Sequence, residues 1–288
     1  MKKLTMEKKR YSMTKFSMTV FVLLMLIVGA IPLMRHTLSS IWNNPMHLTA
    51  LTENPQIHYE NGALEYARYV ADILSDCINQ IEAAQEKPFA KPITIGVYNT
   101  KDAYASANGT GHANAAGMTT FMGNVVLSPD LFIGQRQRLR AILTHELSHA
   151  HLRSHLSILK YIHVPNWFKE GLAVMVSGGG GAEQVAKTEA LNAIRKGIRI
   201  SMENKGSLFH VSKIAFENET DELVPFQMQY KQASLFVEYL NEKNTDGFKI
   251  MLSELLEGQS FEKALFAGFH TRLDTLWSEF AAQTESFR

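Results

Sequence analysis

The feature that most constrains this chain is a pair of histidines, His145 and His149, which lie four residues apart around Glu146 in the segment THELSH. Side chains four residues apart lie on the same face of an α-helix, one turn above the other. The segment therefore predicts a helix, over about 136–157, that offers two imidazoles to one cation. Glu146 lies beside such a cation rather than on it, where a carboxylate suits a general base acting on water.

A third ligand is expected downstream, because catalytic zinc usually takes three protein ligands and leaves a fourth position open. Glu170, in the segment VPNWFKEGLAVMV, is the candidate. Pro165 and Asn166 predict the start of a helix over 166–176, which places Glu170 near its first turn. The alternative is a core helix with satisfied histidines and a Glu170 on the surface.

Composition limits the kinds of ligand and partner. The single cysteine, Cys77, excludes an internal disulfide and a cysteine-based zinc site, and its place on the apolar stripe of a predicted helix indicates a core residue. Residues 1–35 carry seven lysines and arginines against one glutamate, although the whole chain has a net charge of only +1. The remainder is therefore acidic, which argues against nucleic acid as a partner.

The amino-terminal segment predicts export. Residues 16–34 are nineteen residues without a charge, long enough for a helix to cross a bilayer, and they follow a basic leader at 1–15 that we expect in the cytoplasm. We expect a single-pass anchor in the cell membrane with the rest of the chain outside the cytoplasm. The alternative is a signal peptide cleaved near Val28-Gly29-Ala30, which would give a secreted protein.

The remaining pattern predicts an α+β fold, with a small, mostly antiparallel sheet followed by a helical half. A linker is expected over 35–56 and one domain over 57–288. Apolar spacing predicts a helix at 61–85, and β-branched residues predict strands at 93–98 and within 117–129. Further helices are expected at 183–197, 226–243, 246–257, 260–267 and 271–285.

The segments AILTHELSHAHL and NWFKEGLAVMVS resemble the gluzincin zinc peptidases, and specifically the peptidase MA-like domain of bacterial membrane and secreted proteins. The likeness covers about 57–285; its HExxH pattern is specific and its flanking segments are looser. It implies a zincin-like fold in which His145, His149 and Glu170 bind one Zn²⁺. It also implies that Gly117, Met118 and Thr119 form a strand that pairs with an extended substrate, although plain sheet structure is the alternative.

The resemblance also implies a phenol or imidazole that stabilises the oxyanion. Tyr230 is the candidate and His210 a weaker one, and packing is the alternative role for Tyr230. Some relatives carry an acidic residue one turn after the ligand glutamate, where this chain has Val174. The partner that orients a ligand histidine must then come from elsewhere or be a backbone carbonyl.

Two neighbouring features are open to a plainer interpretation. His151 and His155 repeat the spacing of four residues on another face of the helix, and we expect them to be solvated. The glycine run at 177–181 is either a lid over the site or a plain linker.

These observations predict a membrane-anchored or exported enzyme that hydrolyses peptide bonds with the help of zinc. One alternative is a non-catalytic zinc-containing module that binds peptides or a membrane partner. Another is a membrane-tethered structural domain without metal. The oligomeric state does not follow from the sequence.

Overall fold

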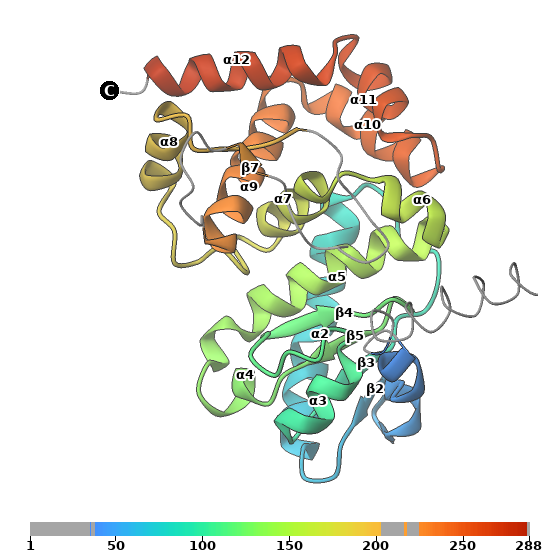
Figure 1. The fold of residues 1–288 in the computed structure, drawn as a ribbon. Coiled ribbons are helices and arrows are strands. Elements are labelled where there is room, and N and C mark those ends of the chain that lie inside the picture. The colour runs from blue at the N-terminus through green and yellow to red at the C-terminus, as the bar shows by residue number, and fades with distance from the viewer. Residues whose placement is uncertain (1–34, 36–37, 203–215, 218–224, 287–288) are drawn as a thin grey trace, which may run out of the picture.

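The computed structural model describes residue 35 and residues 38–202, 216–217 and 225–286. A five-stranded sheet lies at one end of these residues, and the helices of the C-terminal half lie at the other end (Figure 1). Helix α5 (Leu139–His155) runs between the two parts. The elements follow the order expected for an α+β fold, but the expected type of sheet needs correction.

The sheet is mixed, so the prediction of a mostly antiparallel sheet is wrong. Two of its four strand pairings are antiparallel, β1 with β2 and β4 with β5, whereas β2 with β3 and β3 with β5 are parallel. The helix over Leu64–Ala84 returns the chain between β2 and β3, whereas strand β4, antiparallel to β5, returns it between β3 and β5. The order is β1 (Thr49–Leu51), β2 (Asn54–Tyr59), β3 (Ile95–Val97), β5 (Val125–Leu127) and β4 (Gly117–Thr119).

The segment 117–129, expected to hold one strand, forms the hairpin of β4 and β5. The turn between them is closed by two backbone hydrogen bonds of 2.8 Å, from Thr120 N–H to Asn124 O and from Gly123 N–H to Thr120 O. Gly123 has a φ of +87°, a conformation that glycine adopts without steric cost. The hairpin makes β4 an edge strand, next to β5 alone.

The two faces of the sheet bury different side chains. Ile95, Val97, Val125 and Leu127 pack into the main core together with α2 (Leu64–Ala84) and α5. Side chains on the other face of the sheet, among them Tyr98 and Val126, form a smaller core with α3 (Lys101–Ala107). Cys77, on α2, is fully buried in the main core, which confirms its interpretation as a core residue.

Most of the long helices lie close to their expected positions, because their apolar spacing was strong. Helices α7 (Asn166–Val176) and α9 (Phe226–Lys243) begin and end where the pattern predicts. Short elements with too few residues to show a period were missed. The missed elements include η1 (Pro45–His47), α4 (Asp130–Ile133), η2 (Arg136–Arg138), α6 (Ile158–His163), β6 (Arg199–Ile200) and β7 (Phe216–Glu217). The other expected helices are α8 (Lys187–Arg195), α10 (Thr245–Leu256), α11 (Phe261–Phe269) and α12 (Leu273–Ser286).

The structure tests the predictions for the N-terminal region only in part. Within the described residues, no helix combines the length and the apolar character needed to cross a bilayer. The predicted span at 16–34 and the leader at 1–15 lie outside the described residues. The range 35–56, expected to be a linker, contributes η1, strand β1 and the beginning of β2 to the fold.

Helix α7 is held against α9 by a very close crossing at Gly171. A Cβ atom at this position would lie 2.5 Å from the Ala233 carbonyl oxygen and 2.9 Å from a methyl carbon of Val237. Trp167, at the start of α7, packs its ring on Phe236 of α9 at 5.1 Å between centroids. These contacts fix the first turns of α7, and therefore the position of Glu170, relative to the rest of the fold.

We predict that Gly171→Ala lowers the free energy of unfolding by about 1–3 kcal/mol, measured by urea denaturation, because the added methyl group meets the backbone of α9. The helix propensity of alanine offsets only part of this loss, at most about 1 kcal/mol. Gly134→Ala is the matched control, since a Cβ there meets nothing within 4 Å. Equal stability of the two variants would contradict the close crossing.

Candidate metal centre

His145 and His149 lie on consecutive turns of α5, as their spacing predicts. Both are buried, with 5% and 6% of their surface exposed, and their Nε2 atoms are 3.2 Å apart. Helix α5 is buried on nearly all sides, because α2, the sheet and α7 each cover part of its surface. The two imidazoles therefore face the interior of the molecule rather than bulk solvent.

Glu170 reaches the same point from α7. The helix starts directly after Pro165, whose ring fixes its φ and removes a backbone donor, as expected at a helix start. The Oε2 atom of Glu170 lies 3.3 Å from His145 Nε2 and 3.4 Å from His149 Nε2, and the residue is only 6% exposed. The expectation that these three side chains meet is confirmed, and the alternative with Glu170 on the surface is excluded.

The three ligand atoms could hold a metal ion. Tetrahedral zinc with bonds of about 2.0–2.2 Å requires ligand atoms about 3.3–3.6 Å apart, and the three separations of 3.2–3.4 Å are close to this range. The Oε2 atom of Glu170 is buried without a hydrogen bond of proper alignment. A buried acceptor with two imidazole nitrogens beside it fits a cation.

The charges of the cluster favour a cation as well. Burial alone would raise the pKa of Glu170, but the adjacent imidazoles hold it well below its ordinary value, so the group stays a carboxylate. Burial also opposes the charged form of His145, yet the Glu170 and Glu146 carboxylates raise its pKa. The site thus favours a positive charge among the three side chains, whether a proton or a metal ion carries it.

A backbone carbonyl orients His145. Its Nδ1 atom donates to Gly180 O at 2.8 Å, and because a carbonyl only accepts, the Nε2 atom of the neutral ring keeps its lone pair. With Val174 in place of an acidic residue, the sequence left two partners possible, a residue elsewhere or a backbone carbonyl, and the structure shows a carbonyl. It is supplied by the glycine run at 177–181, which therefore supports the site and is not a plain linker.

The glycine run is fixed from both sides. The hydroxyl of Ser177 accepts from Gly180 N–H at 2.9 Å and donates to Val174 O at 3.1 Å. A Cβ at position 180 would lie 2.5 Å from the Ala141 carbonyl oxygen on α5, so only glycine permits this approach. The run consequently presses one carbonyl against the ligand histidine.

Glu146 lies beside the ligands and is 7% exposed. Its carboxylate accepts a hydrogen bond of 2.9 Å from the Thr119 hydroxyl on β4. Gly117, on the same strand, faces Glu146, whereas Met118 packs into the smaller core on the other face of the sheet. The structure thus brings Gly117 and Thr119 to the centre and turns the Met118 side chain away from it.

Tyr230, on the second turn of α9, stacks on the ring of His145 with centroids 6.1 Å apart. Burial, and then the Glu170 and Glu146 carboxylates, raise the pKa of its phenol well above the ordinary value. The phenol therefore keeps its proton and can donate it in a hydrogen bond. His210, the weaker candidate for this role, lies outside the described residues.

Two neighbours of the centre were missed at the level of the sequence. Burial, followed by the Glu170 carboxylate, raises the pKa of Tyr161, on α6, so its phenol also stays protonated. Lys169 is 2% exposed, its ammonium lies 4.5 Å from the centre of the Tyr161 ring, and burial lowers its pKa to about 8. Tyr161 lies outside the quoted segments, and Lys169, although it precedes Glu170 in one of them, occupies a position to which the pattern gives no role. The contact between α6 and α7 reveals both residues.

The prediction that His151 and His155 are solvated is wrong for His151, which is fully buried. Burial lowers its pKa to about 4, so the ring is neutral at pH 7. Its Nε2 atom bonds Lys87 O at 2.8 Å, and His155 Nε2 bonds Pro88 O at 2.9 Å. The pair therefore attaches the segment after α2 to the back of α5 and takes no part in the metal centre.

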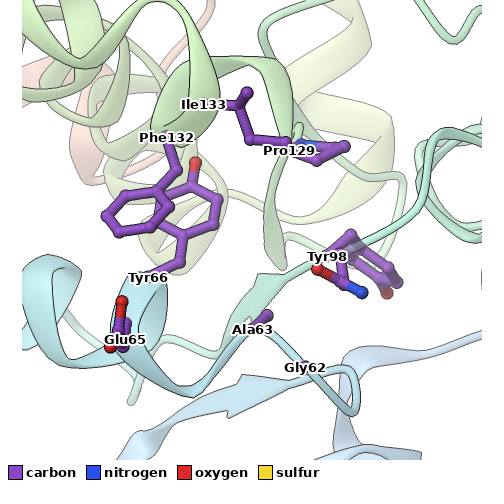
Figure 2. Close-up of a pocket in the computed structure, with 9 residues that line it drawn as sticks. Gly62, Ala63, Glu65, Tyr66, Tyr98, Pro129, Phe132 and Ile133 are labelled. Carbon is purple, nitrogen blue, oxygen red and sulfur yellow. The ribbon is translucent and has the colours of Figure 1, made fainter.

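A pocket elsewhere on the molecule shares no residue with this centre. It encloses about 100 Å³ between the start of α2, the end of β3 and α4 (Figure 2). Tyr66 and Phe132 stack at one side of it, with ring centroids 4.9 Å apart. Glu65 is the only acidic residue in its lining, which contains no histidine or cysteine, so the lining offers no group of metal ligands.

We predict that Glu170→Ala lowers the affinity for Zn²⁺ by at least about 100-fold, because it removes one of three protein ligands. The measurement is a competition titration with a chromophoric chelator on the full chain. Glu53→Ala is the matched control, since Glu53 is exposed and pairs with Arg68 on the surface. Equal zinc affinity of both variants would remove Glu170 from the ligand set.

Comparison of the chain with models of protein families, with curated proteins and with solved structures gives no match in any of the three.

Proposed function

We propose that this protein is a zinc-dependent enzyme that hydrolyses peptide bonds, in the manner of the gluzincins that its motifs resemble. The observation that carries the proposal is the convergence of His145, His149 and Glu170 within 3.2–3.4 Å of one another, with the carboxylate of Glu146 next to them. Two histidines and a glutamate form a donor set typical of catalytic zinc in peptidases. A zinc ion bound there would polarise the scissile carbonyl and make a water molecule more acidic.

The residues of the chain divide the remaining work. Glu146 takes a proton from the attacking water and delivers it to the leaving amine, which requires a carboxylate held beside the ligands. The phenol of Tyr230 is protonated and donates a hydrogen bond to the oxygen on which negative charge develops. The free edge of β4 offers backbone groups to an extended peptide, because its other edge pairs with β5.

The alternative, a zinc-containing module that binds peptides without cleaving them, is less well supported. Such a module has no use for a buried carboxylate beside the metal ligands. Glu146 is nevertheless buried next to the centre with a hydrogen bond from Thr119. Burying a carboxylate costs free energy, and its retention here favours a role in the reaction. Export from the cytoplasm, inferred from residues 16–34, stays a prediction.

We predict that the full chain cleaves casein in a chelator-sensitive reaction that zinc restores, and that Glu146→Gln lowers kcat by about 10²–10⁴-fold while zinc stays bound. The measurements are steady-state rates and zinc content by mass spectrometry. Glu53→Gln, at an exposed position paired with Arg68, should behave as the wild type. Zinc bound without cleavage of casein or of a peptide library would favour the binding module instead.

We predict that Tyr230→Phe lowers kcat by about 10–100-fold, because the phenol donates to the developing oxyanion. The phenol is also hydrogen-bonded to the Glu170 carboxylate, so zinc content is measured beside the rate. Tyr161→Phe, measured alongside, distinguishes between the two protonated phenols near the centre. A loss confined to Tyr161→Phe would transfer the role to Tyr161. Wild-type rates in both variants would contradict a phenol in the reaction.

A further inference from the structure

Strand β4 lies against the motif helix through alternate residues. Gly117 and Thr119 face α5, whereas Met118 between them packs into the smaller core on the other side of the sheet. This alternation follows from the period of two residues in a β-strand. The side chain of Thr119 therefore points at the helix that carries Glu146.

The hydroxyl of Thr119 reaches two acceptors of the same residue. Its Oγ1 atom lies 2.9 Å from Glu146 Oε2 and 2.8 Å from the backbone oxygen of Glu146. A threonine hydroxyl has one hydrogen, so it donates to one of them at a time. The backbone oxygen lies inside α5 and also accepts the helical amide of residue 150, whereas a carboxylate oxygen is the stronger acceptor for the hydroxyl hydrogen.

This hydrogen bond has no substitute in the structure. Among the described residues, the Thr119 hydroxyl is the only side-chain group found to donate to the Glu146 carboxylate. A bond to an ionised acceptor is shorter and stronger than one between neutral groups. The carboxylate of Glu146 is consequently fixed in direction by one hydroxyl on a neighbouring strand.

A glycine at position 117 lets the strand approach the helix closely. A Cβ there would lie 2.9 Å from Cγ2 of Ile142 and 3.0 Å from Cγ of Glu146. A larger residue at this position would have to displace these side chains or the strand. The close approach at Gly117 thus sets the distance at which the Thr119 hydroxyl meets the carboxylate.

We propose that Thr119 is a positioning residue, whose hydroxyl holds the carboxylate of Glu146 in the direction required for proton transfer. The inference rests on the proposed hydrolytic function and assigns the side chain a role separate from the pairing of a substrate with the backbone of β4. Thr119 acts on the reaction through Glu146 and needs no contact with the substrate.

The test compares Thr119→Val, which keeps the shape but removes the hydroxyl, with Thr119→Ser, which keeps the hydroxyl. Thr119→Val should lower kcat by about tenfold or more with KM and zinc content unchanged, and Thr119→Ser should stay within about threefold of the wild type. Thr94→Val, next to β3 and two strands away, is the matched control. A Thr119→Val enzyme with wild-type kcat would overturn the proposal, as would an equal loss in both Thr119 variants.

A second readout does not depend on turnover. In crystal structures of the metal-free variants, the Glu146 carboxylate should occupy one conformation in the wild type and in Thr119→Ser, and should leave it in Thr119→Val. An unchanged carboxylate in Thr119→Val would overturn the positioning role. An inactive wild type would contradict the hydrolytic function as well as the role of Thr119. An active wild type, an inactive Glu146→Gln and a fully active Thr119→Val would contradict only the role of Thr119.

Discussion

The structure depends most on a carboxylate enclosed between two imidazoles. An ionised group that is 6% exposed, as Glu170 is, costs several kcal/mol unless a positive charge and well-placed donors compensate it. Helices α5 and α7 each present polar atoms to the interior at this point. These atoms meet one another, the Gly180 carbonyl and the phenol of Tyr230. The aromatic packing of Trp167 and the crossing at Gly171 then set α7 at the depth where compensation is possible.

The parts of this arrangement that the sequence predicts are those with a local period. The spacing of His145 and His149 requires a helix, and Pro165 marks the start of the next helix at the correct residue. Both inferences concern residues within one or two helical turns, where backbone geometry alone relates the side chains. Val174 in place of an acidic residue left two partners possible for a ligand histidine, another residue or a backbone carbonyl, and only the structure shows that it is the Gly180 carbonyl.

The parts that the sequence does not predict depend on contacts between distant segments. Parallel pairing of β2, β3 and β5 follows from the return of the chain through α2 and through β4, and no period in a strand of three residues reveals its direction. His151 looks like a solvated residue until the segment after α2 is seen to cover it. The meeting of Thr119 with Glu146 likewise requires the register of the β4–β5 hairpin, which a single apolar stretch leaves undefined.

The carbonyl of Gly180 has a consequence for how this centre tolerates variation. A main-chain oxygen is present whatever residue occupies the position, so no exchange of side chain can delete the acceptor that sets the tautomer of His145. Substitutions can only displace it, through Ser177 or through the crowding of α5 at position 180. The orientation of the His145 ring therefore depends on the backbone conformation of residues 177–181. Substitutions that leave this backbone conformation unchanged leave the imidazole in place.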